Sequence, residues 1–555
     1  EGGQTRDVKL HGTPVQRERS AGACRGVNGI GAAAADGAAA GREAAIAAGF
    51  AAAPDVPLPD TPAPDHRLHP VWEVKGSGKA FVDLQDDVTT NDIRLAHREG
   101  FSHIEHAKRY TTHAMGTDQG KSGGIVGAAV LAEARGEPVA KVGLPRFRPY
   151  TAPISWGAMA GQEVGKHFQP VRRTSLHATH DAAGAVWMDA GIWKRPAYYP
   201  KPEDTDAWAS VKREARAVRQ RVGICDVSTL GKIAVEGPDA ATFLDRVYAN
   251  TFSTLPVGRA RYGLMLREDG IVFDDGTTSR IGPERFFVTT TTAQAGPVMQ
   301  HLEFHLASAW PDLDVSLASI TDQWAAVAIA GPKAREVVAG VVQGIDLSND
   351  AFPFMAVADC TAAGVPARLF RISFSGELAY EIAMPAGYAA HVWQAAMAVG
   401  AAHGIEPYGM EALGLLRVEK GHVAGSELNG QTTAHDLGLG RMLKKKGDFI
   451  GRVLAQRPGM TDPYRPRLVG LRSVDPQRQI RAGAHLLVEG RDQGWITSAT
   501  QSVLNPGWIG LGMLRDGEAR IGSTILAANP LMGEEVPVHV VNPHGYDPEN
   551  RLVRA

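Results

Sequence analysis

The chain has 555 residues, a hydrophobic share of 44%, a charged share of 21% and a formal net charge of −2. This length exceeds that of one ordinary domain, so we expect two to four domains. The nearly balanced charge gives no general basic field, which argues against nucleic acid and anionic membranes as partners.

The three cysteines, Cys24, Cys225 and Cys360, are far apart and follow no disulfide or zinc-binding spacing. We therefore expect a cytoplasmic protein without a disulfide framework or a metal site. The chain begins with Glu1, and its first residues are typical of the end of a domain, which suggests a fragment or a processed chain.

Residues 19–50 predict a short strand, a glycine turn and a long helix of small residues. Gly26, Gly29 and Gly31 suit a backbone that approaches a ligand closely, and a helix amino terminus there could face a phosphate. Because the spacing is not G-x-G-x-x-G, a tightly packed turn is favoured over a nucleotide site. Charged residues interrupt the Ala-rich run 31–53, which favours a buried helix over a membrane span.

The Pro-rich segment 54–70 is typical of a linker. After it, "KAFVDL" predicts a buried strand. We expect Thr90 to cap the next helix, and Ser102 with Glu105 to form a capping box for the helix after that.

Two later segments, "KIAVEGPDAATFLDRV" and "VAIAGPKAREVVAGVV", share one pattern of strand, Gly-Pro and amphipathic helix. Pro238 and Pro332 are expected at the first helical position, where a missing N–H costs nothing. Two such units packed about a common centre would provide a place for a cavity. From about Thr461 to the end, alternating strands and turns predict a small antiparallel barrel.

The segment "YGLMLREDGIVFDDGTTSRI" predicts a hairpin with Asp269-Gly270 as its turn. Its second strand carries the paired carboxylates Asp274 and Asp275. Neighbouring strand residues point to opposite faces, so one of the two is expected to face a cavity. Without other motifs, two acids at a solvated strand end would be the favoured explanation.

Six motifs occur in a fixed order along the second half of the chain. They are "RRTSLHATHDAAGAVWMDAGIWKRPAYY", "DVSTLGKIAVEGPDAATFLDRVYAN", "VGRARYGLMLREDGIVFDDG", "FSGELAYEI", "GMEALGLLRVEKG" and "LGRMLKKKGDFIGR". Together they resemble the aminomethyltransferase family, typified by the T-protein of the glycine cleavage system, from about His167 to the end. The resemblance implies a three-part ring around tetrahydrofolate.

The upstream segment from "KAFVDL" to "GKSGG" resembles the alpha subunits of heterotetrameric sarcosine oxidases. In that family the preceding domain is a two-dinucleotide fold that carries NAD, and residues 22–45 resemble its last strand and helix. The first nucleotide-binding motifs do not occur in this sequence, so an NAD site would be incomplete.

The expected fold class is therefore α+β and multidomain: the end of an α/β dinucleotide-binding domain, a small α/β connecting domain and a T-protein-like folate-binding fold with a terminal antiparallel β-barrel. The expected parts are 1–53 as the dinucleotide-domain remnant, 54–70 as the linker, 71–165 as the connecting domain, 166–460 as the folate-binding domain and 461–555 as the barrel.

The resemblance implies roles for single residues. Asp275 is the main catalytic candidate and a folate contact, with Asp274 as the fallback. Thr291 stands where T-proteins commonly have an asparagine near the folate. Glu377 is expected to accept from the N–H groups of the pterin, and Tyr380 either packs beside the ring or fills the core.

Other motif residues have structural explanations beside the functional ones. For Arg417 and Glu419 an ion pair within the helix is favoured over a folate contact. For the lysines at 444–446 a solvated basic loop is favoured over contact with the folate glutamate tail. Thr174, His177 and His180 resemble the family's first motif, and the histidines could equally be packing residues.

The implied reaction is oxidative demethylation of sarcosine to glycine, with hydrogen peroxide as a product and transfer of the one-carbon unit to tetrahydrofolate. The implied partners are beta, gamma and delta subunits, with FAD in beta, FMN near the alpha–beta contact and any zinc in delta. Two alternatives remain: a subunit of a related N-methyl amino-acid dehydrogenase, such as one for N-methylglutamate, or a non-catalytic folate-binding scaffold.

Overall fold

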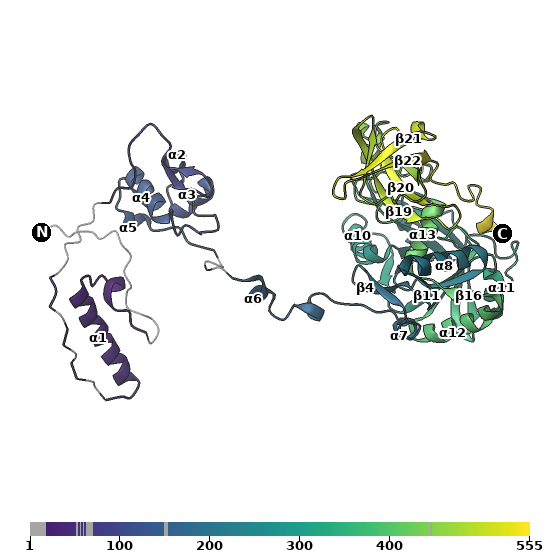
Figure 1. Cartoon of the computed structure of the whole chain (residues 1–555), viewed down its shortest axis with the longest axis horizontal. Helices are drawn as coiled ribbons and strands as arrows, with labels where there is room; N and C mark the ends of the chain where they lie inside the picture. The colour runs from purple at the N-terminus through teal and green to yellow at the C-terminus, as the bar shows by residue number, and fades with distance from the viewer. Residues whose placement is uncertain are drawn as a thin grey trace. The chain divides into compact units, whose positions relative to one another are not determined.

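The computed structural model describes residues 18–51, 54–55, 57–58, 60–62, 70–148, 152, 154–443 and 447–555. The chain divides into two compact units, residues 1–165 and 166–555, and each is described by itself (Figure 1). Within the described ranges, no helix is both long enough and apolar enough to cross a bilayer.

The first unit begins with a 3₁₀ turn at Gly22–Arg25 and helix α1 at Ile30–Ala47. The strand expected before the helix does not form, because no neighbouring strand is present among the described residues of this region to pair with it. The expected burial of the helix is also wrong, since none of its residues is buried. Gly26 and Gly29 have φ angles of 80° and 97°, a left-handed backbone that favours glycine.

The rest of the first unit is a small α/β assembly. Its elements are β1 (Phe81–Asp83), β2 (Val88–Thr89), α2 (Thr90–Arg98), α3 (Ile104–Thr111), α4 (Gly124–Arg135), α5 (Val139–Val142) and α6 (Trp156–Ala160). The two strands pair antiparallel, and α2 and α4 pack their apolar faces together around Ile93 and Leu131, which have no exposed surface.

Both helix caps predicted here are displaced in the structure. The N-cap of α2 is Thr89, not Thr90, and it forms a capping box with Asp92. The N-cap of α3 is His103, whose Nδ1 accepts from the Glu105 backbone N–H at 3.2 Å. Ser102 bonds instead to the ring of His97 at 2.8 Å, so the expected capping box is wrong. In each case a neighbouring polar residue with extended backbone provides the acceptor.

The second unit contains two large sheets. One has the strand order β10 (Ser316–Ser319), β6 (Gly231–Glu236), β9 (Arg285–Thr290), β8 (Val272–Gly282) and β7 (Arg259–Leu266). The other has the order β12 (Val342–Gln343), β13 (Val357–Ala362), β14 (Val365–Phe370), β15 (Ala379–Pro385), β11 (Trp324–Ala330), β5 (Val222–Asp226) and β16 (Ile405–Pro407). All pairings are antiparallel except that of β16 with β5.

Helices cover one face of each sheet. Helices α9 (Ala240–Val247) and α10 (Ala295–Ser308) pack on the five-stranded sheet, and α11 (Ala334–Val341) and α12 (Ala389–Gly400) pack on the seven-stranded sheet. The opposite faces of the sheets share a core with α8 (Ala207–Gln220) and α13 (Met410–Lys420). A short hairpin, β3 (Val186–Ala190) and β4 (Trp193–Tyr198), and α7 (His177–Ala182) precede these elements.

The two Gly-Pro segments form the expected strand–helix units, β6 with α9 and β11 with α11. Pro238 and Pro332 do not occupy the first helical position, however; each lies two residues before it. Gly237 and Gly331 have φ angles of 137° and 131°, and each begins a tight turn. In each turn the glycine carbonyl accepts a hydrogen bond from the backbone N–H of the first helical residue. The proline lies inside that turn, where its fixed φ is also suitable.

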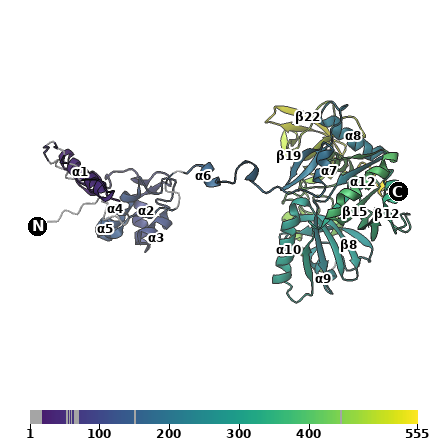
Figure 2. The ribbon, with the colours of Figure 1, turned by 90° about the horizontal axis from the view of Figure 1, so that it is seen from below.

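The expected antiparallel barrel is confirmed. Its strands are β17 (Arg467–Ser473), β18 (His485–Val488), β19 (Arg491–Gln501), β20 (Trp508–Leu514), β21 (Thr524–Asn529) and β22 (Glu534–Val541). They close in the order β17-β20-β19-β18-β21-β22 around an apolar interior. In Figure 2 the barrel strands lie at the opposite end of this unit from α9, α10 and β8.

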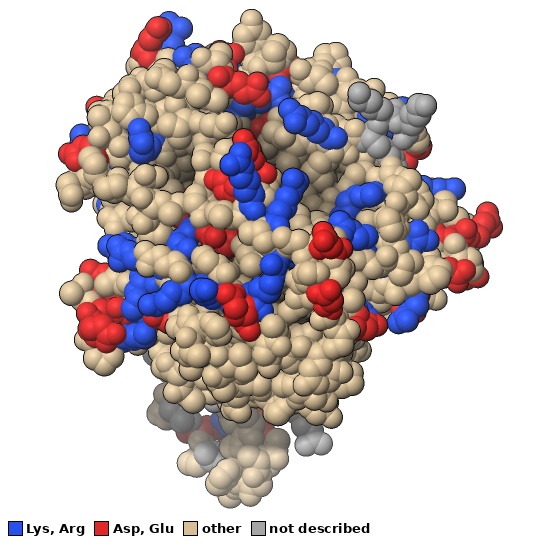
Figure 3. Space-filling model, turned by 90° about the vertical axis from the view of Figure 1, so that its right-hand side faces the viewer, with Lys and Arg blue, Asp and Glu red and all other residues tan. Residues whose placement is uncertain are grey.

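The charged surface of the second unit is mixed in sign. Figure 3 shows basic and acidic side chains interspersed over the face in view, without one large region of a single sign. This distribution agrees with the formal net charge of −2.

Candidate functional site

The hairpin that carries the paired carboxylates has the expected turn. The Gly270 N–H donates to the Arg267 carbonyl at 2.9 Å, and Gly270 has a φ of 88°. Strand β8 then runs antiparallel to β7, which places Asp274 opposite Met265 and Asp275 opposite Leu264. The two carboxylates therefore lie on neighbouring, paired positions of β8 against the outer strand β7, not at a free strand end.

Asp274 is buried and held by Thr291. The Thr291 hydroxyl donates to Asp274 Oδ1 at 2.6 Å, and the Thr291 backbone N–H donates to Oδ2 at 3.2 Å. Only 2% of Asp274 is exposed. Thr291 was predicted to contact the folate. In the structure its hydroxyl and its backbone N–H both donate to Asp274.

Asp275 is partly exposed and is held by a different donor. The Tyr262 hydroxyl donates to Asp275 Oδ2 at 2.6 Å from the neighbouring strand β7. Asp275 is therefore the more accessible of the two acids, as a residue that contacts a substrate must be. Tyr262 was not singled out from the sequence, although the register of an Asp-Gly hairpin could have placed it near Asp275.

Both carboxyl groups hold protons more tightly than a solvated aspartate does. Burial, with a smaller effect of the neighbouring Asp275 charge, raises the pKa of Asp274 to about 7, against the lowering effect of Thr291. Burial also raises the pKa of Asp275, against the effect of the Tyr262 hydrogen bond. A carboxyl group that titrates nearer neutrality can both accept and return a proton.

The raised pKa of Asp274 predicts a pH-dependent effect of Asp274→Asn. The native pKa of about 7 lies above the solvated value of 3.8, so the Asp274 contribution to stability falls as pH rises between these values. We expect the variant and the parent chain to have similar free energies of unfolding at pH 4. At pH 8 the variant should be more stable, by up to about 4 kcal/mol.

Denaturant titrations at both pH values measure this difference. Glu214 and Glu381 also have pKa values raised to about 7 by burial, so the pH dependence of the free energy of unfolding of the parent chain alone does not isolate Asp274. The difference in this free energy between the variant and the parent chain isolates it. A difference that is the same at pH 4 and pH 8 would contradict the assignment.

A small cavity separates the inner faces of the two sheets. It is lined by Lys232, Thr277 and Thr289 from the five-stranded sheet and by Ala326, Glu381 and Ala383 from the seven-stranded sheet, among others. Its volume is about 10 Å³, the space of roughly one water molecule. The common centre expected for the two strand–helix units therefore exists, but it is nearly filled by side chains.

Two buried charged groups face this cavity. Burial raises the pKa of Glu381 to about 7, partly offset by Lys232. Burial lowers the pKa of Lys232 to about 8, partly offset by Asp226 and Glu381. The Lys232 ammonium donates to the Ser228 and Leu230 carbonyls at 2.8 and 2.9 Å. Lys232 has no clear local sequence signal, because Glu381 comes from a strand about 150 residues away and only Asp226 is close in the sequence.

Tyr380 and Glu381 point to opposite faces of β15. Tyr380 has no exposed surface, packs in the core beneath α11 and α12, and its hydroxyl accepts from Arg335 Nε at 3.1 Å. Glu381 lines the inter-sheet cavity on the other face. The structure therefore favours the core-filling explanation for Tyr380 and does not bring it together with Asp275.

Glu377 lies in a buried ionic cluster. Its Oε1 accepts from Arg219 Nη1 at 2.8 Å and from the Tyr546 hydroxyl, and 2% of the residue is exposed. Arg219 also binds Glu419 Oε2 at 2.9 Å and stacks over the Tyr546 ring. The acceptor predicted for the pterin N–H groups is thus engaged by groups of the chain itself.

The ion pair expected between Arg417 and Glu419 does not form. Arg417 pairs with Glu427 at 2.9 Å, whereas Glu419 pairs with Arg219. Residues two apart on a helix do not face each other, so the two side chains on α13 reach partners in different directions. The favoured conclusion that both are structural still agrees with their burial.

The first motif residues surround a buried acid. The Thr174 hydroxyl donates to Asp226 Oδ2 at 2.7 Å, and His180 Nε2 lies 3.2 Å from the same oxygen. Tyr199 bonds the other ring nitrogen of His180 at 3.0 Å, and His177 stacks on Trp187. These contacts fasten α7 to strand β5, so the packing explanation for both histidines is favoured.

The remaining sequence candidates belong to other segments of the chain. Gly26 and Gly29 flank the start of α1, and the Gly31 N–H donates to the Thr61 hydroxyl at 2.8 Å. The lysines at 444–446 lie outside the described residues. All three cysteines are free.

Three family models match the chain. They are the GCVT N-terminal domain over residues 176–447, the Sarcosine oxidase A3 domain over 77–162 and the Glycine cleavage T-protein C-terminal barrel domain over 467–547. An aminomethyltransferase from Streptomyces coelicolor is 33% identical over 337 residues, which cover 60% of this chain and 86% of that protein. The chain belongs to the aminomethyltransferase family.

A solved structure supports the same fold. The glycine cleavage system aminomethyltransferase T from Bartonella henselae matches with a TM-score of 0.59 and 25% identity, covering 67% of this chain and 97% of that one. The chain is also 50% identical over 491 residues to the sarcosine oxidase subunit alpha of Rhizobium meliloti, covering 87% of this chain and 50% of that protein. It thus spans about half the length of the sarcosine oxidase alpha subunits that it matches.

Proposed function

We propose that this chain is the one-carbon-capturing part of a sarcosine oxidase alpha subunit, with tetrahydrofolate as the acceptor. The observation that carries the proposal is Asp275. It is a partly exposed carboxylate with a raised pKa, held by Tyr262, in a chain of the aminomethyltransferase family. The 50% identity to a sarcosine oxidase subunit alpha supports sarcosine as the source of the carbon.

The proposed chemistry divides between two polypeptides. A flavin bound by a partner subunit would supply the two-electron oxidation of the N-methyl group of sarcosine, with oxygen as the final acceptor and hydrogen peroxide as its product. The imine product reaches this chain, where its carbon forms bonds to two folate nitrogens. The former imine nitrogen takes up the two hydrogens that those nitrogens lose and departs as the amine of glycine, which leaves 5,10-methylenetetrahydrofolate.

Asp275 would act on the protons of this transfer. Its carboxylate can accept hydrogen bonds from folate N–H groups, take a proton as the nitrogen attacks the imine carbon and return it to the departing amine. Tyr262 fixes the orientation of the carboxylate. The cavity of about 10 Å³ is too small for a pterin ring, so we do not assign it as the folate pocket.

The partners proposed are the beta, gamma and delta subunits, with FAD in beta and FMN near the contact with beta. An NAD site is not proposed for the described residues. Gly26 and Gly29 adopt a suitable turn, but one amino-terminal N–H of α1 is already bonded to Thr61, and no sheet accompanies the helix among the residues described there.

Turnover of sarcosine by the complex purified with its partner subunits tests the proposal. Peroxide, formaldehyde and methylenetetrahydrofolate are followed with and without tetrahydrofolate, and an excess of a formaldehyde-consuming dehydrogenase keeps free formaldehyde from condensing with the folate in solution. We expect peroxide in both cases and a shift from formaldehyde to methylenetetrahydrofolate when the folate is present. Turnover of N-methylglutamate but not of sarcosine would contradict the substrate, and formaldehyde release unaffected by folate would contradict the capture step.

A further inference from the structure

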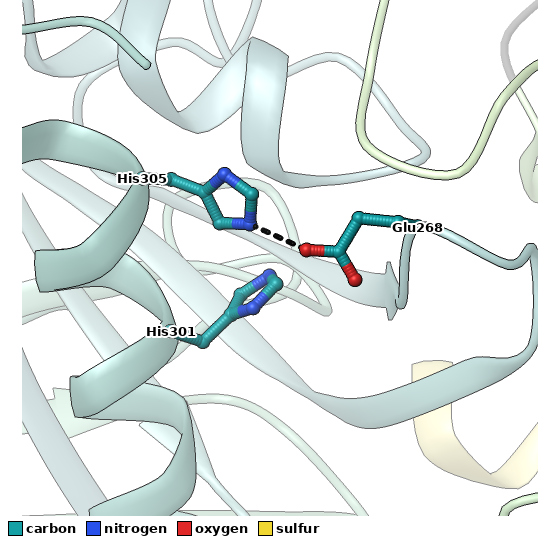
Figure 4. A group of neighbouring side chains, drawn as sticks. All are labelled: Glu268, His301 and His305. Carbon is teal, nitrogen blue, oxygen red and sulfur yellow. Dashed lines mark ion pairs between the residues drawn. The ribbon is translucent and has the colours of Figure 1, made fainter. Parts of the chain in front are cut away.

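Three side chains converge where the β7–β8 turn meets helix α10. His301 and His305 lie four residues apart on α10, so their rings project from the same side of the helix. Glu268 comes from the turn that connects β7 to β8. Figure 4 shows the two imidazole rings and the carboxylate pointing toward one another.

The donor atoms are close enough to share one ion. One ligand atom from each residue lies within 4.8 Å of the other two, and His305 Nε2 is 3.2 Å from Glu268 Oε1. No other group of three or more such residues meets this distance within the described part of the chain. His305 is 8% exposed, whereas Glu268 is exposed, so the group is buried on the helix side and open to solvent at the turn.

Two ring nitrogens in this group lack hydrogen bonds. Nε2 of His301 and Nε2 of His305 are buried, and neither makes a hydrogen bond to the described residues, although His305 Nε2 has the ion-pair contact with Glu268 Oε1. A buried imidazole nitrogen without a partner is costly, and such groups call for a ligand or a functional reason.

Packing alone accounts for the ring faces but not for these nitrogens. His301 packs against Phe273 with ring centroids 4.9 Å apart, and His305 stacks on Trp310 at 5.6 Å. An ion pair would need only one histidine beside Glu268. The convergence of two imidazole edges on one carboxylate is therefore left unexplained by aromatic contacts.

We propose that Glu268, His301 and His305 bind a divalent transition metal ion, with Zn²⁺ the preferred one and water as the fourth ligand. Two imidazole nitrogens and one carboxylate oxygen form a ligand set that Zn²⁺ uses, whereas Mg²⁺ and Ca²⁺ prefer oxygen ligands. Tetrahedral bonds of about 2.0–2.1 Å require ligand atoms about 3.3 Å apart. The exposed Glu268 side chain can move the remaining distance.

Such an ion would fasten the β7–β8 turn to α10. The same turn leads directly into β8, where Asp274 and Asp275 follow six and seven residues after Glu268. The site is therefore a structural clip near the carboxylates, and it is separate from the proposed folate chemistry.

Titration of the metal-free 555-residue chain with Zn²⁺ tests the proposal. Calorimetry gives the stoichiometry and affinity, and Co²⁺ in place of Zn²⁺ gives visible absorption that reports tetrahedral coordination. We expect one tight site, and at least tenfold weaker binding in Glu268→Gln and in His301→Gln/His305→Gln. His485→Gln is the matched control, since His485 also pairs with an acid, Asp492, at 2.9 Å but lacks a third ligand; its binding should match the parent chain.

Folding is checked by circular dichroism and by the melting temperature without metal. Glu268→Gln changes an exposed side chain, so it keeps the test valid if the double histidine variant fails to fold. Zn²⁺ should raise the melting temperature of the parent chain and not that of Glu268→Gln. No tight Zn²⁺ site in the parent chain, or equal affinity in Glu268→Gln, would overturn the proposal.

Discussion

Asp275→Asn is expected to separate amine oxidation from one-carbon capture. In the assembled complex, peroxide formation from sarcosine should stay within about twofold of the parent rate, because the proposed function assigns the flavin chemistry to another polypeptide. Formation of methylenetetrahydrofolate should fall by about 10²–10⁴-fold, the usual range for removal of a general acid or base. The uncaptured carbon should appear as formaldehyde.

The measurement needs a trap for released formaldehyde, since free formaldehyde condenses with tetrahydrofolate in solution. An excess of a formaldehyde-consuming dehydrogenase removes that background and reports the leak directly. Asp274→Asn is the matched comparison, because it is the adjacent acid and is bound by Thr291 rather than by Tyr262. A larger loss of capture in Asp274→Asn than in Asp275→Asn would move the catalytic role to Asp274.

Tyr262→Phe gives a second view of the same site. It removes the hydroxyl that donates to Asp275 and that lowers the pKa of this acid. We expect the pH profile of folate capture to shift toward higher pH, while the pH profile of sarcosine oxidation is unchanged. An unchanged capture profile would mean that Asp275 does not titrate in the rate-determining step.

Arg219→Met is expected to cause the largest loss of stability. Arg219 lies between the buried carboxylates Glu377 and Glu419 and also donates to the Ser375 and Leu416 carbonyls. Removing the guanidinium leaves two buried acids without their cation. Loss of one partner from a buried ion pair costs about 3–5 kcal/mol, so we expect a fall of that size in the free energy of unfolding.

Arg221→Met provides the matched control only two residues away. Arg221 pairs with Glu406 at 2.7 Å, but 49% of its side chain is exposed, and Glu406 keeps Arg213 as a partner. An exposed pair of this kind contributes about 1 kcal/mol or less. Urea titration followed by tryptophan fluorescence compares the two variants, and similar losses would contradict the special role of Arg219.

Neutralising the acids should restore part of the lost stability. Replacing Glu377 and Glu419 by glutamine in the Arg219→Met background removes the uncompensated charges. We expect the triple variant to be more stable than Arg219→Met alone. If it is not, the loss in Arg219→Met comes from packing rather than from buried charge.

Local patterns predicted the elements of this chain better than their contacts. The Asp269-Gly270 turn, the two strand–helix units and the terminal barrel follow from residues close in sequence, and the structure contains all of them. The errors at the helix caps are small displacements, such as the cap of α2 at Thr89 instead of Thr90, whereas the strand and the burial expected around α1 are wrong. A cap requires one extended residue with a free acceptor, and two neighbouring threonines satisfy that pattern equally.

The candidate site was harder to predict because its contacts are distant in the chain. Glu377 pairs with Arg219, which is separated from it by 158 positions in the sequence. No local motif indicates that the acid is already paired. Tyr380 and Glu381 show a second limit. Neighbouring strand residues point to opposite faces, so an error of one position places a core residue in the cavity or a cavity residue in the core. The motif "LAYEI" does not determine which residue faces the cavity.

The closed barrel restricts how a partner polypeptide can attach to this unit. Every barrel strand from β17 to β22 is hydrogen-bonded on both sides, so no strand there can accept another chain by sheet extension. The two open sheets differ, because β10 bounds one of them and β12 and β16 bound the other, whereas the outer side of β7 is already bonded to the backbone at Ala249 and Met355. Any subunit that docks on the barrel must therefore recognise side chains and loops, whereas main-chain pairing needs an open boundary strand such as β10.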